Sequence, residues 1–450
     1  MRTLFDDAIV LTMDDAMRVH DRGHVLIEGD AIALVGAGPG PRGRADRVVE
    51  CAGDIIMPAM VNPHAHLPMT LFRGLGEDVD DRLYRYVLPL ERRFVDPAMV
   101  RVGTALAAVE TIRAGIGTVA DMYYYEEEVG RMLDAAGLRG VVGQTIADFD
   151  PPDHATIDEG FARFDALRSE FAGHPRITAS LAPHAPYSTG PDVLRRCAAV
   201  AERTGAPVQI HLAEMASEMA WCAENHAVRP VALVDRAGLL AEGLIAAHCL
   251  YLNEAEIALI AERGVRVAHN ARSNAKAGRG IAPVTALLKA GARVGIATDG
   301  PMSGNTLDLF AQFGPVAMFQ KLAGKSRAPM PAAEIVRMAT RGGAEVLGMD
   351  DRIGTLAPGM AADLTRVSTR GVHMRPLYDP YAALVFCATP ADVRDLVVDG
   401  AMLLDDGVPR TVDEERAVVD AEAIAARFKA AMMRIDATID ARTVAEAHAR

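Results

Sequence analysis

Hydrophobic and polar positions change their pattern at about residue 59 of this 450-residue chain. From there to residue 354, short apolar runs alternate with amphipathic stretches such as 100–115 and 191–205. That alternation predicts parallel strands joined by helical crossovers. Eight runs are present, the number that closes a TIM-like (β/α)8 barrel. They span residues 59–66, 117–125, 139–148, 176–186, 206–214, 243–252, 265–273 and 293–300.

The segments on either side of this region have the texture of short strands. Residues 1–58 hold strand-like runs separated by Gly and Asp turn signals, and similar runs return after residue 355. We expect residues 1–58 and 355–450 to pair as one small β-sandwich domain, which ends in an Ala-rich helical tail over about 413–447. Residues 59–354 would then form the barrel domain. The long stretch 67–99, between the first barrel strand and its helix, is expected at the active site.

Charge and cysteine content narrow the range of partners. The net charge is −13, and no long basic block is present to neutralise the phosphates of nucleic acid or a membrane surface. The five cysteines are far apart, which argues against a disulfide framework. We find no signal-peptide pattern and no apolar run that approaches the ~20 residues of a membrane span. These features predict a cytoplasmic protein that acts on a small molecule.

Ionisable side chains fall at the ends of the predicted strands, so they would share the C-terminal mouth of the barrel, where barrel enzymes build their sites. They are His64, His66, His184, His211, Glu214, His248 and Asp299. His64 and His66, two apart on a strand, share one face and can direct both imidazoles to one ion. The alternative for any single histidine is a buried, hydrogen-bonded polar group. Taken together, the set predicts a Zn²⁺ or Fe²⁺ site with an open position for water.

Several motifs resemble the amidohydrolase superfamily over nearly the whole chain. They include "PHAHLPMTLFRGLGED", "LAPHAPYS", "IHLAE", "VAHNARSNAKAGRGIAPV" and "GIATDGPMSGNTLDLF". They are similar to the branch that deaminates S-adenosylhomocysteine, methylthioadenosine and adenosine, which is related to guanine deaminases and chlorotriazine hydrolases. The resemblance implies one divalent metal per subunit, zinc in preference to iron, and a homo-oligomer.

The resemblance also implies roles for individual residues. The metal ligands would be His64, His66, His211 and Asp299. Glu214 would be the general acid, His248 would hydrogen-bond the attacking oxygen, and Asp299 would accept a proton from water. The residues implied in substrate binding are Glu91, His184, Glu214 and, more weakly, Ser303.

One departure from the family bears on the substrate. Relatives that accept S-adenosylhomocysteine have an arginine after strand three to hold its carboxylate, whereas this chain has Gln144, Asp148 and Asp150 there. Because carboxylates repel carboxylates, selectivity for that substrate is an open question.

The sequence therefore predicts a metal-dependent aminohydrolase that converts an adenosine-type purine to the inosine analogue and ammonia. One alternative is hydrolysis of another heterocycle, such as guanine, a pterin or an s-triazine. A more distant alternative is a barrel that serves only as a non-catalytic scaffold.

Overall fold

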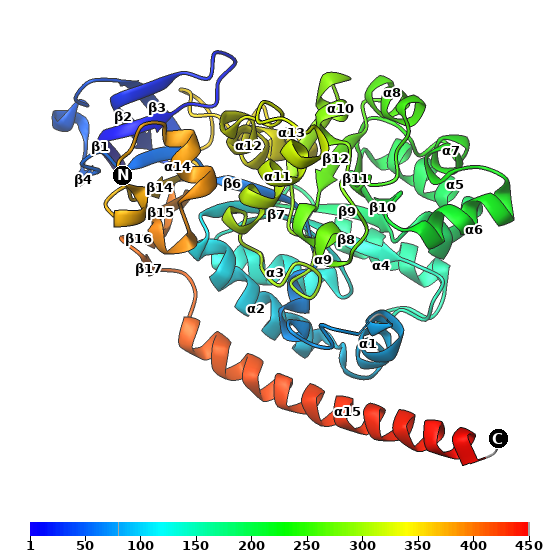
Figure 1. Ribbon diagram of the computed structural model, residues 1–450. Coiled ribbons are helices and arrows are strands. Elements are labelled where there is room, and N and C mark those ends of the chain that lie inside the picture. The colour runs from blue at the N-terminus through cyan, green and yellow to red at the C-terminus, as the bar shows by residue number, and fades with distance from the viewer. Residues whose placement is uncertain (80, 449–450) are drawn as a thin grey trace.

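A nearly closed barrel of parallel strands dominates the computed structural model, which describes residues 1–79 and 81–448, with side chains in the last helix as far as residue 438 (Figure 1). The eight strands follow one another around the barrel in chain order. They are β6 (Met60–Ala65), β7 (Ile116–Tyr123), β8 (Arg139–Ile146), β9 (Ile177–Pro183), β10 (Val208–Leu212), β11 (Leu244–His248), β12 (Arg266–His269) and β13 (Arg293–Ile296). Each lies in one of the eight predicted runs, to within a residue, so the predicted barrel is confirmed.

A buried side chain links the first and last strands. Asn62 on β6 accepts from the backbone N of Thr298 (3.2 Å) and donates to its Oγ1 (2.7 Å). The backbone N of Asp299 then donates to the carbonyl of His64 (3.2 Å). These bonds hold Asp299, beyond β13, beside the end of β6.

Helices surround the barrel and begin and end at recognisable signals. Thr156 and Asn253 form capping boxes at the starts of α4 and α8, and Gly137 and Gly205 end α3 and α5 with positive φ. The barrel-associated helices are α1 (Leu88–Phe94), α2 (Pro97–Arg113), α3 (Glu126–Ala136), α4 (Ile157–Glu170), α5 (Pro186–Thr204), α6 (Ala216–His226), α7 (Pro230–Arg236), α8 (Glu254–Glu262), α9 (Ala271–Lys276), α10 (Val284–Lys289), α11 (Phe310–Ala323), α12 (Ala332–Ala339) and α13 (Arg341–Leu347).

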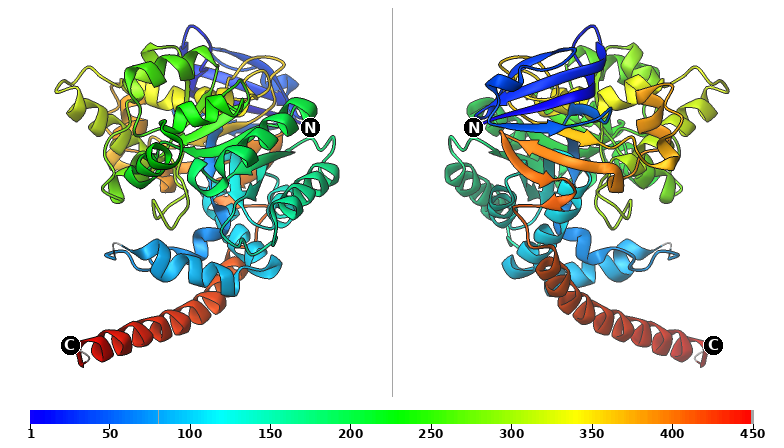
Figure 2. Two further views of the ribbon diagram at one scale, coloured as in Figure 1. Left: turned by 90° about the vertical axis from the view of Figure 1, so that its right-hand side faces the viewer. Right: turned by 90° about the vertical axis from the view of Figure 1, so that its left-hand side faces the viewer.

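The strands of the two terminal segments form a separate mixed sheet of nine strands, visible beside the barrel in Figure 2. From the N-terminal segment come β1 (Arg2–Leu11), β2 (Val19–Glu28), β3 (Ala31–Ala37), β4 (Arg47–Glu50) and β5 (Ile55–Pro58). From the C-terminal segment come β14 (Leu364–Val367), β15 (Val393–Val398), β16 (Ala401–Asp405) and β17 (Val408–Pro409).

The two segments meet where β5 pairs antiparallel with β14, with Pro58 opposite Leu364. Phe5, Val25, Leu364 and Val397 share one buried core. The predicted association of the two ends of the chain is therefore confirmed, while the domain boundaries at residues 59 and 354 stay a prediction.

Shorter elements complete the chain. They are the 3₁₀ helices η1 (Arg42–Arg44), η2 (Leu67–Phe72), η4 (Val372–Met374) and η5 (Pro390–Asp392), the π-helix η3 (Leu83–Val87), and helix α14 (Pro380–Phe386). Segment 67–99 thus contains η2, η3, α1 and the start of α2.

The 35-residue helix α15 (Glu414–His448) corresponds to the predicted tail and runs along the outside of α2 (Figures 1 and 2). Its inward side chains Ala417, Ala421 and Phe428 are buried. Among the residues that the structure describes, no helix combines the length and apolar character that a bilayer crossing requires.

Candidate metal and substrate site

The predicted ionisable residues gather at the C-terminal mouth of the barrel. His64 lies near the end of β6 and His66 directly follows that strand; His184 follows β9; His211 lies in β10, with Glu214 just beyond it; His248 ends β11; Asp299 follows β13. Parallel strands bring these positions to one end of the barrel, so residues far apart in sequence become neighbours.

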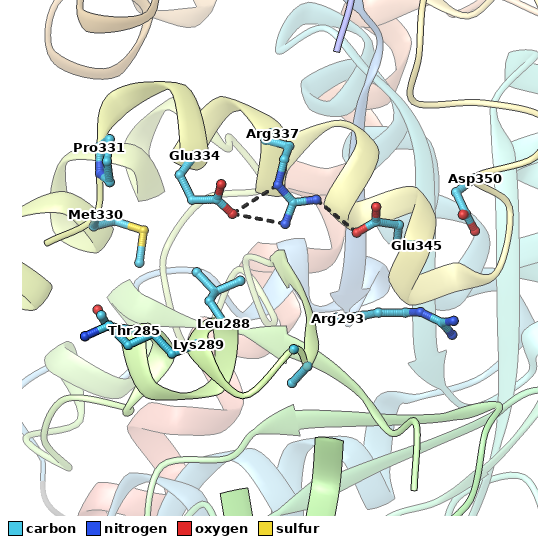
Figure 3. Close-up of a pocket in the computed structure, with 12 residues that line it drawn as sticks. Thr285, Leu288, Lys289, Arg293, Met330, Pro331, Glu334, Arg337, Glu345 and Asp350 are labelled. Carbon is cyan, nitrogen blue, oxygen red and sulfur yellow. Dashed lines mark hydrogen bonds and ion pairs between the residues drawn. The ribbon is translucent and has the colours of Figure 1, made fainter. Parts of the chain in front are cut away.

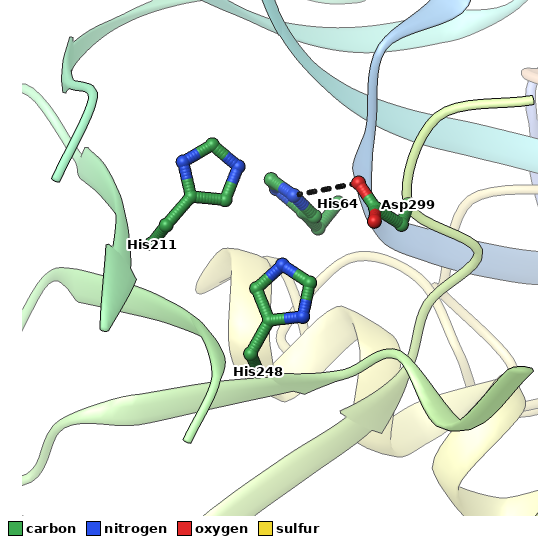
Figure 4. Close-up of side chains that lie close together, drawn as sticks. All are labelled: His64, His211, His248 and Asp299. Atoms are coloured by element: carbon green, nitrogen blue, oxygen red, sulfur yellow. Dashed lines mark ion pairs between the residues drawn. The ribbon is translucent and has the colours of Figure 1, made fainter. Parts of the chain in front are cut away.

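Four of these side chains point toward one another in Figure 4. The donor atoms of His64, His211, His248 and Asp299 all lie within 4.8 Å of one another. This group differs from the ligand set predicted from the sequence at one position, because it contains His248 in place of His66. The structure also places His66 Nε2 3.2 Å from Asp299 Oδ1 and 3.3 Å from His211 Nε2. All five side chains thus surround one point, and the choice of ligands among them stays a prediction.

Hydrogen bonds behind three imidazoles set their tautomers. Nδ1 of His66 donates to the carbonyl of Met122 (2.5 Å), and Nδ1 of His211 donates to the carbonyl of His184 (2.8 Å). Nδ1 of His248 donates to Oδ1 of Asn274 (2.8 Å). Since these oxygens only accept, each Nδ1 carries a proton, and Nε2 is the ring nitrogen that faces the cluster.

The resulting arrangement fits a divalent metal. Nε2 of His66 and Nε2 of His211 lie 3.3 Å apart, close enough for both to bind one cation. Both ring nitrogens of His64, and Nε2 of His248, are buried without a hydrogen-bond partner among the described residues. Burial lowers the pKa of His64 to about 4, which keeps this imidazole neutral and able to ligate. Imidazole nitrogens with one carboxylate suit Zn²⁺ or Fe²⁺.

Asp299 is held as an anion at the centre of the cluster. Burial by itself raises its pKa, but the neighbouring imidazoles of His64 and His66, whose Nε2 atoms lie 3.6 and 3.2 Å from Oδ1, outweigh burial and bring the pKa well below the usual range. Its Oδ2 accepts from Ser273 Oγ (2.6 Å) and its Oδ1 from the backbone N of Gly300 (2.8 Å). Asp299 and His248 have φ of +61° and +72°, and such strained backbone in non-glycine residues is concentrated at functional sites.

The cluster opens into a cavity of about 370 Å³, a size typical of small-molecule sites. Apolar and aromatic side chains form much of its wall, among them Met69, Leu83, Val87, Tyr124 and Phe149. The cavity also contains every residue that the sequence analysis assigned to substrate binding, namely Glu91, His184, Glu214 and Ser303.

Two of these residues are deeply buried polar groups. Glu91, 6% exposed, accepts a hydrogen bond from Tyr123 Oη (2.8 Å), and burial raises its pKa to about 7. His184 contacts Ser188 Oγ through Nδ1 (2.8 Å), and burial lowers its pKa to about 3. The cavity therefore offers hydrogen-bonding groups on the side of α1 and on the side of β9.

Glu214 lies between the cluster and the cavity. Its Oε1 is 3.6 Å from Nε2 of His248 and forms an ion pair with Arg279. Behind it, the buried Glu218 accepts from the backbone N of Ala213 (3.0 Å) and of Glu214 (2.8 Å). The turn that presents Glu214 is thus fixed by a second carboxylate.

The three polar residues at and after the end of β8 lie in different surroundings. Gln144 is buried and donates to Thr145 O and Asp153 Oδ2, and it is not part of the cavity lining. Asp148 lines the cavity, whereas Asp150 lies 3.5 Å from Arg92. Of the three residues that stand in place of the expected arginine, one carboxylate therefore faces the cavity.

A larger hollow of about 610 Å³ lies near the start of β13, at the other end of the barrel (Figure 3). Arg337 spans its wall and pairs with Glu334 and Glu345, each at 3.0 Å. No residue from the predicted site lines it. It lies at the end of the barrel opposite the ionisable cluster, a face associated with stability and not with chemistry, so the smaller cavity is the candidate site.

The sequence analysis missed the supporting residues Ser273, Asn274, Glu218 and Arg279. Ser273 and Asn274 follow the seventh strand, which is the same positional signal that identified the ligands. Ser and Asn are not the usual metal-binding side chains, so the sequence alone gives no reason to single them out. The folded structure shows that Ser273 orients Asp299 and that Asn274 orients His248.

The chain is similar to known proteins over most of its length. A family model described as the amidohydrolase family matches residues 55–403. A 5-methylthioadenosine/S-adenosylhomocysteine deaminase of Syntrophobacter fumaroxidans is 40% identical over 90% of this chain and 93% of its own length. A 5′-deoxyadenosine deaminase of Methanothermobacter thermautotrophicus is 36% identical over 90% of this chain and 95% of its own.

Solved structures show the same architecture. An adenosine deaminase from Xanthomonas campestris with bound zinc superposes with a TM-score of 0.93 at 33% identity, covering 95% of this chain and 98% of that one. An atrazine chlorohydrolase from Arthrobacter aurescens, in complex with zinc, has a TM-score of 0.87 at 23% identity, covering 94% and 100%. At 23% identity, the similarity to the second structure supports a shared fold and nothing further.

Proposed function

Because the chain belongs to the amidohydrolase family, we propose that it is a metal-dependent aminohydrolase that deaminates an adenosine-type purine. The substrates we propose are methylthioadenosine, S-adenosylhomocysteine or adenosine, with the inosine analogue and ammonia as products. The observation that carries the proposal is one cavity that joins the histidine and aspartate cluster to Glu214, Glu91 and His184. Deaminase relatives that match along most of the chain support it.

The proposal includes one zinc ion per subunit. We assign His64, His66, His211 and Asp299 as its ligands, with His248 beside them. A divalent metal bound by these residues would supply Lewis acidity, which would lower the pKa of water from 15.7 to about 7. We further propose that the enzyme works in the cytoplasm as a homo-oligomer.

The protein's own residues then move the protons. Asp299, held as a carboxylate, accepts a proton from the attacking water. Glu214 protonates the ring nitrogen next to the reacting carbon, which makes that carbon electrophilic, and His248 hydrogen-bonds the attacking oxygen. Asp299 then passes its proton to the amino nitrogen, and collapse of the tetrahedral adduct breaks the C–N bond and releases ammonia. The hydroxyl group of the adduct becomes the carbonyl of the product and returns a proton to Glu214. Glu91, His184 and Ser303 bind and orient the nucleoside.

The lining of the cavity bears on the substituent at the 5′ carbon. Asp148 faces the cavity, while Arg279 is engaged by Glu214 and Arg82 lies 3.5 Å from Glu77. No cation of the lining is thus left without an acidic neighbour among the described residues. We expect methylthioadenosine to be turned over faster than S-adenosylhomocysteine, whose carboxylate Asp148 would repel.

The test is ammonia release by zinc-reconstituted protein with methylthioadenosine, S-adenosylhomocysteine, adenosine and guanine side by side. Asp299→Ala should abolish release, and Glu214→Gln should retain zinc and lower kcat by roughly 10²- to 10⁴-fold. Near-normal turnover by Glu214→Gln would remove Glu214 from the mechanism. If zinc is bound and none of the four compounds releases ammonia, the substrate is instead another heterocycle, such as a pterin or an s-triazine. Inertness to those as well would favour a non-catalytic scaffold.

A further inference from the structure

The outer wall of the cavity is built by η3 and α1, residues 83–94, which we call the wall segment. The side chains that it directs into the cavity are Leu83, Tyr84, Val87, Leu88 and Glu91. These elements are only 5 and 7 residues long. Helices this short are not stable by themselves, so what packs against the wall segment decides where Glu91 lies.

The opposite face of the wall segment contacts the C-terminal helix α15. Tyr86 Oη donates to Asp436 Oδ1 (2.6 Å), and Arg85 Nη2 donates to the same oxygen (2.9 Å). Tyr86 is 5% exposed, so its hydroxyl meets α15 from within the protein. A bond from a neutral donor to a carboxylate is stronger than one between neutral groups, which makes Asp436 an effective tether.

A second contact lies about two turns earlier on α15. Phe428 is fully buried, and its ring centroid is 5.2 Å from that of Phe94, the last residue of the wall segment. It also lies 4.8 Å from the ring of Phe72, at the end of η2. Figure 1 shows α15 passing outside α1 and α2. The helix therefore covers the wall segment at both its beginning and its end.

On its inner side, the wall segment is held by the bond from Tyr123 to Glu91. None of the described α15 side chains lines the cavity or belongs to the cluster. The helix reaches the site through the wall segment and, by way of Phe72, through η2. The bond from Tyr86 to Asp436 involves the wall segment alone, so removing that bond tests substrate binding apart from the chemistry.

We propose that α15 is a positioning element for the substrate: Asp436 and Phe428 hold the wall segment against the cavity and so place Glu91 to receive the nucleoside. This inference rests on the proposed function as far as the substrate is concerned. The tether itself does not depend on which reaction the site catalyses.

The first experiment separates binding from chemistry. Asp436→Ala removes both bonds of the tether, and Tyr86→Phe removes one of them and leaves the bond from Arg85. Asp420→Asn is the control, because Asp420 pairs with Arg416 on the same helix (2.7 Å). We expect each tether variant to raise KM for the nucleoside roughly five- to tenfold, with kcat within twofold and zinc content unchanged. The double variant should be no worse than Asp436→Ala, since that variant already lacks the bond to Tyr86.

The second experiment does not require activity. Trypsin can cut the wall segment after Arg85, Arg92 or Arg93 once the segment opens, and the rate of cutting tracks the open population. We expect faster cutting within residues 83–94 in Asp436→Ala than in the wild type or Asp420→Asn. Faster cutting with a raised KM supports the inference, whereas unchanged cutting, or an unchanged KM in a working nucleoside deaminase, overturns it. If the wild type releases no ammonia from nucleosides, the proposed substrate is wrong. The rates of trypsin cleavage alone then decide whether α15 holds the wall segment in place.

Discussion

The imidazoles of His66, His211 and His248 are each oriented by a hydrogen bond on the side of the ring away from the cluster. His248 is the clearest example, because its Nδ1 donates to the side chain of Asn274, whereas His66 and His211 donate to backbone carbonyls. A backbone carbonyl cannot be removed by substitution, but Asn274 can. This makes the support of His248 accessible to experiment.

Asn274→Ala should weaken zinc binding or activity roughly 10- to 100-fold, because His248 would lose the acceptor that fixes its tautomer and ring plane. Zinc affinity is measured by competition with a chromophoric chelator, and turnover by ammonia release. Asn225→Ala is the control, since Asn225 is exposed on α6 and its side chain donates to the carbonyl of Trp221 in the same helix. Wild-type affinity and turnover in Asn274→Ala would show that His248 needs no such support.

Glu91 should make the protein less stable as pH rises from about 4.5 to 7. Burial raises its pKa to about 7, so in this range the folded protein holds a proton that the unfolded chain releases. Stability contributed by the neutral carboxyl is complete below pH 4.5 and is lost as pH approaches 7, by about 3 kcal/mol at most. Urea unfolding between pH 5 and 7 should give a flatter free-energy curve for Glu91→Gln. Parallel curves would show that Glu91 ionises normally.

The long connection after β6 depends on close contact between helices. Gly103 of α2 packs against η2, which begins directly after His66, and a Cβ at Gly103 would lie 2.5 Å from the carbonyl oxygen of Pro68. Thr70 Oγ1 also donates to the carbonyl of Gly103 (2.8 Å). Because Gly103 has no side chain, η2 can pack directly against α2, and this packing sets the position of the segment that follows His66.

Gly103→Ala should therefore reduce both stability and activity. The added methyl group must displace backbone atoms of η2, a change that typically costs 1–3 kcal/mol in a packed core. Urea unfolding gives the change in stability, and zinc titration reports whether His66 has moved. Gly43→Ala is a matched control, because a Cβ there meets nothing within 4 Å. An active, fully stable Gly103→Ala would mean that η2 can shift freely.

Patterns within single elements were predictable because they depend on neighbouring residues in the chain. The apolar runs of the barrel strands, and the tail that became α15, are of this kind. The path of segment 67–99 was not, since η2, η3 and α1 are short and are held by distant elements. Phe72 and Phe94, for example, take their places against Phe428, more than 300 residues away.

A buried ion pair joins the barrel to the terminal sheet. Arg139 begins β8 and lies 3.3 Å from Asp363, which immediately precedes β14, and their side chains are 1% and 2% exposed. Arg139 also lies 3.2 Å from Asp399, next to β15. Because the two carboxylates depend on one guanidinium, this contact links the two sheets of the molecule.

Arg139→Met should lower the free energy of unfolding by about 3–5 kcal/mol, since it leaves Asp363 as an uncompensated buried charge. The measurement is urea unfolding at neutral pH. Arg2→Met, which breaks an exposed ion pair with Asp46, should cost at most about 1 kcal/mol. Equal losses in the two variants would show that the buried pair contributes no more than a surface pair.

By itself, the sequence determined the eight barrel strands, the shared β structure of the two chain ends and the types of side chain available at the strand ends. Hydrophobic periodicity depends only on residues that are close in the chain. The rule that parallel strands end at one mouth holds for any such barrel, so it can be applied before the tertiary structure is known. The tertiary structure decided that His248 joins the cluster, that Gln144 turns toward Asp153 and that Arg279 meets Glu214. It also placed α15 behind the wall of the cavity. Such contacts depend on side-chain direction and on packing between residues far apart in the chain, which periodicity does not encode.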